Sequence, residues 1–177
     1  MPVWFRNADR RWPFLWEDAS QPPGRWHGPG SGPAQCLADT PDGAWAEFLR
    51  HEEITDPVDL EGIARHLWAI EDSSDEEEPA APDLPGSVLQ GGLDSYAECQ
   101  QEARRLQDGG ATFLEAPSAA LHEGTAGGEF TRGGLVEADP RDGRVRVFFG
   151  PRPNVHGWLC ASGGRPSERL LSLVRPL

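Results

Sequence analysis

Short apolar stretches separated by Pro and Gly predict most of the regular structure in this chain. The pattern is clearest at residues 65–71, where His66, Trp68 and Ile70 alternate with smaller apolar residues, as in a strand with two packed faces. Further strands are predicted at residues 3–6, 34–38, 111–115, 130–138, 144–149 and 157–161. A turn at residues 139–143, rich in Asp, Pro and Gly, is predicted to join two of them.

Capping residues predict two main helices. Thr40 and Pro41 provide an N-cap and a first helical position, and the helix should run to about His51. Its apolar residues Ala44, Trp45, Phe48 and Leu49 share one face. The sequence Ser95-Tyr-Ala-Glu98 is a capping box for a second helix that ends near Leu106, and a short helix is predicted at residues 166–174. The 177 residues therefore predict a single α+β domain with many short strands and few short helices.

Charge makes two classes of partner unfavourable. Acidic residues outnumber basic ones 29 to 16, which gives a net charge of −13, so the surface repels nucleic acid and anionic membranes. We therefore expect no nucleic-acid partner and no membrane partner. No stretch approaches 18 apolar residues and no basic leader precedes an apolar run, so a cytoplasmic location with reduced thiols is expected.

The acidic charge is concentrated in one segment. Residues 71–83 contain seven Asp or Glu residues and no basic residue, interspersed with Ser and Pro. This composition is typical of a solvated loop or insert at about residues 71–84. The alternative is a docking segment or a mimic of an anionic ligand.

The metal and phosphate motifs that could have assigned a function are absent. Three cysteines form no C-x-x-C pair, five histidines form no paired helical spacing, and we therefore expect no metal. The loop 28–32 is rich in Gly but lacks the spacing of a phosphate-binding loop.

Three polar residues remain as candidates for chemistry. Arg25 lies in a loop stiffened by Pro and Gly and could present a guanidinium fork to phosphate or carboxylate. Glu47 lies beside the apolar face of its helix, where it either faces a cleft or pairs with His51 or Arg50. Ser118 follows a Pro outside any nucleophile motif, so a role in a turn or cap is equally consistent with the sequence.

Five short motifs follow one another along the chain. They are Trp4-Phe5-Arg6, Gly24-Arg25-Trp26-His27-Gly28-Pro29-Gly30, Ala34-Gln-Cys36-Leu-Ala-Asp39, Ala44-Trp-Ala-Glu47 with His51, and Ala116-Pro117-Ser118-Ala119. In this order the motifs resemble the RES domain family, which is named for its Arg, Glu and Ser residues and includes toxins of bacterial toxin–antitoxin pairs. The resemblance covers most of the chain.

The resemblance implies a split, mixed β-sheet similar to that of ADP-ribosyltransferase toxins, arranged around an NAD cleft. It implies cleavage of the nicotinamide–ribose bond, with phosphate or water as acceptor, by an NAD phosphorylase or glycohydrolase. By the same resemblance, Arg6 and Arg25 hold phosphate groups, Glu47 stabilises the oxocarbenium ion, and Ser118 binds substrate or orients Glu47. Trp26, His27 and Cys36 are the further residues implied to contact NAD.

Two positions depart from the family pattern. Cys36 stands where the family has Tyr, and His27 stands where the loop usually has Asn. Transfer of ADP-ribose to a protein, and an inactive module that binds NAD or a protein, therefore remain as alternatives. No retained cofactor is expected, because NAD is a substrate and inorganic phosphate an optional co-substrate. The implied partner is a cognate antitoxin, and a Trp-rich chain of this size is also compatible with a homodimer.

Overall fold

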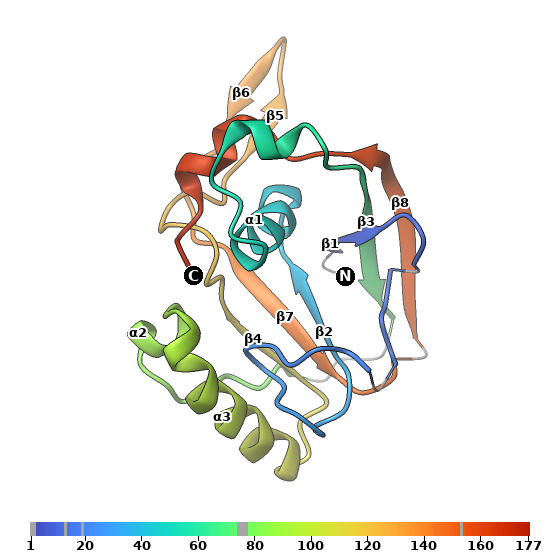
Figure 1. The fold of residues 1–177 in the computed structure, drawn as a ribbon, viewed down its shortest axis with the longest axis vertical. Helices are drawn as coiled ribbons and strands as arrows, with labels where there is room; N and C mark the ends of the chain where they lie inside the picture. Colours follow the sequence, from blue (N-terminus) through green and yellow to red (C-terminus); the bar gives the residue numbers. More distant parts are fainter. Residues whose placement is uncertain (1–2, 13, 19, 74–77, 153) are drawn as a thin grey trace.

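A six-stranded sheet organises the chain. The computed structural model describes residues 3–12, 14–18, 20–73, 78–152 and 154–177. The sheet has the order β4-β7-β2-β1-β3-β8, with β1 Val3–Asp9, β2 Ala34–Ala38, β3 Arg65–Asp72, β4 Phe113–Pro117, β7 Arg144–Phe149 and β8 Val155–Gly164 (Figure 1). A separate two-stranded hairpin, β5 Glu129–Thr131 and β6 Leu135–Glu137, projects from one end of the molecule. The predicted α+β class is confirmed.

The sheet divides between β1 and β2. The strands β1 and β3 pair along their whole length, from Val3 opposite Glu71 to Asp9 opposite Arg65, whereas β1 and β2 pair only at Phe5 and Ala38. The two central strands therefore diverge on either side of a single contact. All pairings between these strands are antiparallel. The expected mixed sheet would contain parallel strand pairs. Among the described residues, parallel contacts occur only as isolated bridges, and one of these lies at the edge of β4.

The helix α1, Pro41–His51, begins where the sequence predicts. Thr40 has extended backbone angles, and its hydroxyl accepts a hydrogen bond of 2.9 Å from the Gly43 amide. Gly43 also allows the helix to approach β2, because a Cβ there would lie 3.1 Å from the Ala38 Cβ. Asn7 of β1 donates to the Ala44 carbonyl at 2.6 Å. These contacts hold the first turn of α1 against the two diverging strands.

The other helices are α2 Gly86–Leu89 and α3 Tyr96–Asp108, with 3₁₀ turns η1 Pro57–Leu60, η2 Leu93–Ser95 and η3 Glu168–Leu173. The predicted capping box at α3 is wrong in its geometry, because Ser95 has helical backbone angles and makes no cap hydrogen bond. Its hydroxyl instead donates to the Gly92 carbonyl at 2.7 Å and accepts from Arg25 at 2.8 Å. Tertiary contact with Arg25 thus replaces the local cap.

Three further expectations change. The predicted strand 130–138 is the separate hairpin β5–β6, because Gly133 and Gly134 take positive φ angles and turn the chain back. The predicted turn at 139–143 therefore does not join two paired strands. The predicted C-terminal helix forms only the short 3₁₀ turn η3. The acidic segment begins at the end of β3, and residues 74–77 lie outside the described part of the chain.

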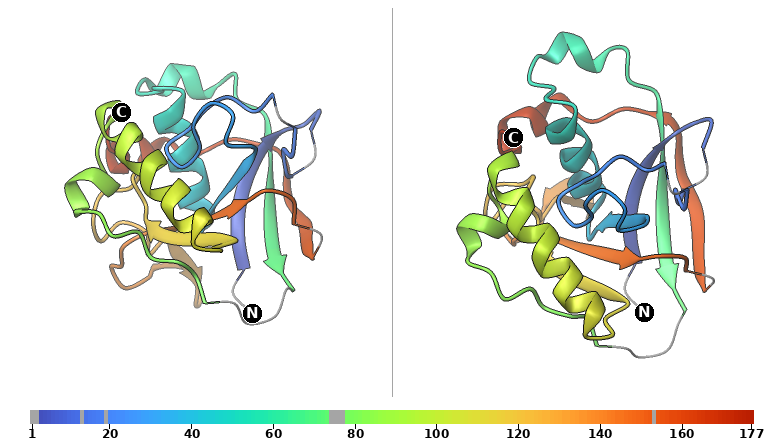
Figure 2. Two further views of the ribbon diagram at one scale, coloured as in Figure 1. Left: turned by 90° about the horizontal axis from the view of Figure 1, so that it is seen from below. Right: turned by 60° about the horizontal axis from the view of Figure 1, so that its bottom comes forward.

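Three apolar clusters cover the two faces of the sheet. Ala38 belongs to the cluster beneath α1, and Ala34 belongs to the cluster beneath α3. Leu37, which points to the other face of β2, packs with aromatic residues such as Trp4 and Phe148. The helices α1 and α3 therefore cover neighbouring parts of one sheet face (Figure 2).

Candidate active site

Cys36, in the middle of β2, is exposed between two buried alanines, and we call the surface around its side chain the recess. Cys36 falls between Ala34 and Ala38 on the same strand face, and thus between the cluster beneath α3 and the cluster beneath α1. Both alanines are buried, whereas Cys36 is solvent-accessible. Desolvation by the surrounding protein raises the pKa of the Cys36 thiol to about 11. The thiol is therefore protonated at neutral pH.

Glu47 and Ser118 meet at this recess from distant parts of the sequence. Glu47 lies on α1, and Ser118 follows the last residue of β4. The Ser118 hydroxyl donates a hydrogen bond of 3.0 Å to Glu47 Oε1. The predicted pair of residues is therefore brought together, whereas His51 is exposed and makes no contact with Glu47 that would support the pairing alternative.

The direction of the Ser118 hydroxyl is fixed by its own loop. Its oxygen accepts from the amides of Ala120 at 3.2 Å and Leu121 at 3.4 Å, so its single proton is available to Glu47. The Ser118 amide donates to Gly143 O at 2.8 Å. A Cβ at Gly143 would lie 3.1 Å from the Ser118 Cβ, so glycine permits this close approach.

The electrostatics of Glu47 are balanced between burial and nearby donors. Burial raises the pKa of the carboxyl above its ordinary value, while the Ser118 hydrogen bond and the positive charges of Arg50 and Arg25 act to lower it. The Ala120 amide adds a smaller lowering effect. A carboxylate in this setting is poorly hydrated and interacts strongly with any positive charge placed beside it.

The Arg25 guanidinium is held by a single loop. One terminal nitrogen donates to the Val88 carbonyl at 3.1 Å and the Ser95 hydroxyl at 2.8 Å, and the other donates to the Gly91 carbonyl at 2.5 Å. The charge of Arg25 acts on Glu47, but both of its terminal nitrogens already have protein acceptors. This geometry fixes residues 88–95 and contributes positive charge to the recess.

Arg50 is a member of the site that the sequence suggested only as a pairing partner. Although it is only 5% exposed, its guanidinium donates to Pro176 O at 3.1 Å and to Gly91 O at 2.7 Å. Arg25 and Arg50 thus share the Gly91 carbonyl. The signal that could have found Arg50 is its position three residues after Glu47, which places both side chains on one side of α1.

Tyr96 is the residue that sequence reasoning missed. It is the one tyrosine in the chain and begins α3, with its ring 4.8 Å from the Arg25 guanidinium carbon. Burial raises the pKa of Tyr96, the charges of Arg25 and Arg50 lower it, and Glu47 and Cys36 are close enough to raise it further. An aromatic phenol therefore stands near Cys36, the position where the resembling family has its own tyrosine.

We call Arg25, Cys36, Glu47, Arg50, Tyr96 and Ser118 the Glu47 cluster. Arg6 adjoins it from β1 and donates to Gln35, a fully buried residue of β2. Burial lowers the pKa of Arg6, whose charge also acts on Cys36. Arg6 therefore acts on the Cys36 thiol through its charge, while its side-chain hydrogen bond goes to Gln35, the neighbouring residue of β2.

Trp26 and His27 do not join the cluster. Trp26 is 2% exposed and packs in the core beneath α3. His27 turns back into its loop, where Nε2 donates to the Pro22 carbonyl at 2.7 Å, and burial lowers the pKa of the ring. The structure therefore gives both residues a role in shaping the loop that carries Arg25.

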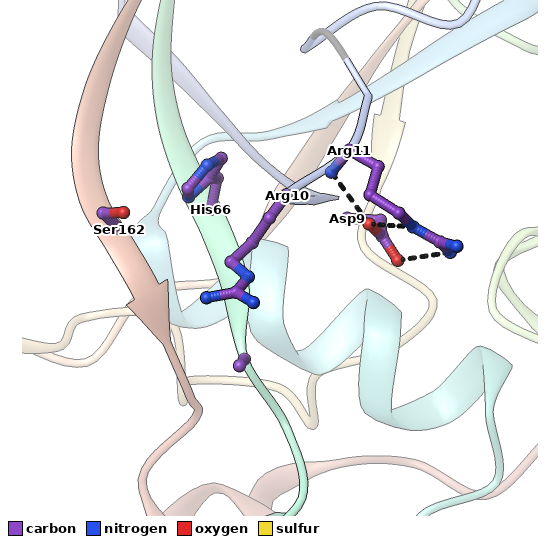
Figure 3. Close-up of a pocket in the computed structure, with 6 residues that line it drawn as sticks. Asp9, Arg10, Arg11, His66 and Ser162 are labelled. Atoms are coloured by element: carbon purple, nitrogen blue, oxygen red, sulfur yellow. Dashed lines mark hydrogen bonds and ion pairs between the residues drawn. The ribbon is translucent and has the colours of Figure 1, made fainter.

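An open pocket elsewhere contains none of the predicted site residues. It is lined by Asp9, Arg10, Arg11, Ala64, His66 and Ser162 (Figure 3). Arg11 is engaged by Asp9 through hydrogen bonds of 2.9 to 3.0 Å, and no hydroxyl–carboxylate pair resembling Glu47–Ser118 lines the pocket. The Glu47 cluster is therefore the candidate active site.

In the described part of the chain, no three His, Cys, Asp or Glu side chains converge as metal ligands. Within the same residues, no helix is long and apolar enough to cross a membrane.

The fold is similar to that of one chain in a solved toxin–antitoxin complex. The crystal structure of the M. tuberculosis MbcT–MbcA toxin–antitoxin complex contains a chain that matches with a TM-score of 0.58 and 17% sequence identity. The match covers 96% of this chain and 86% of that chain. No family model and no curated protein matches this sequence. At this identity the likeness defines a shared α+β fold, and activity must be argued from the site.

Proposed function

We propose that this protein is an NAD-consuming enzyme that cleaves the bond between nicotinamide and ribose. The observation that carries the proposal is the Glu47–Ser118 hydrogen bond of 3.0 Å, set among guanidinium groups in a strongly acidic protein. The sequence resemblance to RES domains supports the same assignment. The structural neighbour is a member of a toxin–antitoxin complex, which supports the role of toxin.

The proposed chemistry needs a fixed negative charge beside the ribose. Departure of nicotinamide builds positive charge on the ribose ring, and the poorly hydrated Glu47 carboxylate stabilises that charge. The Ser118 proton holds one carboxylate oxygen, so the other oxygen remains to face a ribose hydroxyl. Nicotinamide leaves as a neutral group and requires no general acid of its own.

The two loop arginines have different proposed roles. Arg6 binds a phosphate group of NAD or the incoming phosphate, because its guanidinium has one protein acceptor in Gln35. Arg25 acts as a positioning residue, since it holds residues 88–95 and raises the local positive potential. This division modifies the expectation that both arginines bind phosphate directly.

Tyr96 is proposed to supply the aromatic surface that Cys36 lacks. Its ring is already fixed against Arg25, and its phenol lies within electrostatic range of Glu47 and Cys36. A ring on α3 can contact a flat nicotinamide or adenine group across the recess from β2. Loss of the tyrosine at position 36 is therefore compatible with an active site.

The acceptor is tested by incubating the purified protein with NAD, with and without inorganic phosphate. Release of nicotinamide and mass analysis of the ribose product are the readouts. Phosphate-dependent release of phosphorylated ADP-ribose identifies a phosphorylase, and phosphate-independent release of ADP-ribose identifies a glycohydrolase. Label from biotin-NAD on protein identifies an ADP-ribosyltransferase. A folded protein, free of any antitoxin, that releases nothing under all conditions overturns the proposal in favour of a binding module.

A further inference from the structure

A short segment that follows η3 runs beside the loop that contains Ser118. Val174 in this segment forms an isolated antiparallel bridge with Leu121 of the loop. The His122 amide donates to the Leu173 carbonyl at 3.0 Å, which extends the bridge by one residue. The loop is therefore held along its backbone by a segment that lies far from it in the sequence.

Arg175 makes two hydrogen bonds from this segment to the loop. Its amide donates to the Ala120 carbonyl at 2.7 Å, and its side-chain Nε donates to the Leu121 carbonyl at 2.8 Å. Leu121 is 2% exposed, so water cannot readily replace the Nε donor if the side chain is removed. The Arg175 side chain therefore satisfies a carbonyl that has little access to solvent.

These contacts act on the peptide groups that hold the Ser118 hydroxyl. The Ala120 carbonyl and the Leu121 amide belong to one peptide group. Its carbonyl accepts from the Arg175 amide, and its amide donates to Ser118 Oγ at 3.4 Å. The carbonyl of the next peptide group accepts from Arg175 Nε. Because a peptide group is planar, fixing a carbonyl also fixes the direction of the amide beside it.

The same segment also contacts α1. Arg50 Nε donates to the Pro176 carbonyl at 3.1 Å, and Arg50 lies three residues after Glu47 on the helix. The segment therefore contacts both of the elements whose side chains form the hydrogen bond of 3.0 Å between Ser118 and Glu47. Its position is suited to fixing the geometry of that hydrogen bond.

We propose that Arg175 is a positioning residue of the active site, which directs the Ser118 hydroxyl toward Glu47 by holding the peptide groups of residues 120–122. This role rests on the proposed function, because it belongs to the same site. Arg175 acts through Ser118 and is assigned no contact with substrate. A small displacement of a group that orients a reacting side chain is enough to lower the rate of an enzyme.

The charge of Arg175 is a property separate from its hydrogen bonds. Burial raises the pKa of Glu47, while the Ser118 hydrogen bond, the charges of Arg50 and Arg25 and the Ala120 amide lower it. The charge of Arg175 acts instead on Arg50, whose pKa is lowered mainly by burial. The other ionisable groups that interact with Glu47 are Cys36 and Tyr96. A test must therefore separate the donor of Arg175 from its charge.

Two variants of matched length make this separation. Arg175→Gln keeps an N–H donor the same number of bonds from the backbone as Nε and removes the charge, whereas Arg175→Met removes both. We expect Arg175→Met to lower kcat for nicotinamide release by about tenfold with KM changed less than about twofold, and Arg175→Gln to retain at least about half of the wild-type kcat. Wild-type kcat in Arg175→Met, or equal losses in the two variants, would overturn the proposal.

Arg169→Met is the matched control. Arg169 lies in η3 and also binds α1, through a hydrogen bond of 2.6 Å to Asp42, and it is 41% exposed. We expect this variant to keep kcat within about twofold of the wild type, since surface ion pairs contribute little. A control that loses as much activity as Arg175→Met would show a general loosening of α1 and contradict a specific role for Arg175.

A double-mutant cycle tests whether Arg175 acts through Ser118. In the Ser118→Ala background no hydroxyl remains to be oriented, so Arg175→Met should lower kcat by less than about a further twofold. The same fold-loss in both backgrounds would show that Arg175 acts by another route, which rejects the proposed role.

Titration of Glu47 decides the role of Arg175 without NAD. A displaced Ser118 hydroxyl stabilises the carboxylate less, so Arg175→Met should raise the pKa of Glu47 in carbon-13 NMR of labelled glutamate. Arg175→Gln should leave that pKa near the wild-type value, and Glu47→Gln identifies the signal. An unchanged pKa of Glu47 in folded Arg175→Met would overturn the proposal.

Two results remain distinguishable by this design. If circular dichroism shows that Arg175→Met is unfolded, Arg175→Lys replaces it, because lysine keeps the charge but moves the donor one bond farther from the backbone; it should raise the pKa of Glu47 in the same direction. A wild type that releases no nicotinamide rejects the proposed function, while the titration of Glu47 still accepts or rejects the positioning role of Arg175.

Discussion

The Glu47 cluster and the outer edge of β8 differ in almost every physical respect. The cluster lies where the sheet divides, and its charged side chains are engaged by protein donors or acceptors before any ligand arrives. The edge of β8 is uncharged over residues 157–164, its register with β3 shifts between Leu159 and Gly164, and its outer side has no backbone hydrogen bond to another described residue. One region has fixed side chains and a shaped polar surface, and the other has a free backbone.

The Glu47 cluster is suited to binding a small anion, whereas the edge of β8 is suited to binding another polypeptide strand. Preorganised charges favour a ligand with phosphates and a developing positive charge, because their orientation requires no reorganisation on binding. Open amides and carbonyls favour another strand. Substitutions in the cluster should therefore change turnover, and substitutions on the outer edge of β8 should leave turnover unchanged.

The largest expected effect is at Glu47. Glu47→Gln should lower nicotinamide release by about 10³-fold, because the amide keeps the shape of the side chain but removes the negative charge. The same variant should be more stable at neutral pH. A carboxyl whose folded pKa is raised stabilises the fold while protonated and loses that contribution as pH rises through the folded pKa. We expect a gain of roughly 1 kcal/mol, or about 2–4 °C in Tm, by calorimetry.

The second-largest effect is expected for Ser118→Ala. It should lower nicotinamide release by about 10- to 100-fold, the value expected for one hydrogen bond to a charged group. The Ser118 proton lowers the pKa of Glu47, so its removal raises that pKa further. The acid limb of the kcat/KM profile should therefore move to higher pH, and Ser118→Thr should restore part of the rate. An unchanged pH profile would show that Ser118 acts only on the structure of its loop.

Arg25→Lys should affect stability and turnover together. Lysine cannot reach the Val88, Ser95 and Gly91 oxygens at once, and we expect a loss of about 2 kcal/mol in denaturant unfolding. The comparison variant Arg6→Lys should lower turnover with a smaller change in stability, because Gln35 is the one side-chain acceptor of its guanidinium among the described residues. Equal destabilisation by both variants would contradict the different roles of the two arginines.

The smallest effect is expected at Tyr96. Tyr96→Phe keeps the ring against Arg25 and should raise KM by less than about threefold, whereas Tyr96→Leu removes it and should raise KM by about tenfold. Cys36→Tyr in the Tyr96→Leu background is the sharper test, since it returns an aromatic ring to the other side of the recess. A return of KM toward the wild-type value would show that an aromatic ring on β2 can replace the ring on α3.

Local signals predicted the elements that depend on local chemistry. The strand at residues 34–38 and the helix begun by Thr40 and Pro41 are confirmed at the predicted bounds, because capping and alternation act over a few residues. The capping box at Ser95 was wrong because Arg25, seventy residues earlier, takes the hydroxyl as its acceptor. No local pattern contains such a partner.

Prediction of the candidate site from the sequence was limited in the same way. The resemblance brought Glu47 and Ser118 together before their contact of 3.0 Å was seen, since it compares whole ordered motifs. The resemblance did not identify Tyr96 or the contact between Arg50 and Gly91. Both depend on how α1 and α3 meet over β2. Trp26 matched its motif and yet lies in the core, so a motif position does not by itself specify a contact with ligand.

The most direct test of the account compares the wild type with Glu47→Gln in one measurement of nicotinamide release from NAD. Binding of NAD is followed in parallel by the shift in thermal stability. We expect the folded variant still to bind NAD and to release almost no nicotinamide, while the wild type turns over. Equal release by both proteins would contradict the assignment of the Glu47 cluster as the active site.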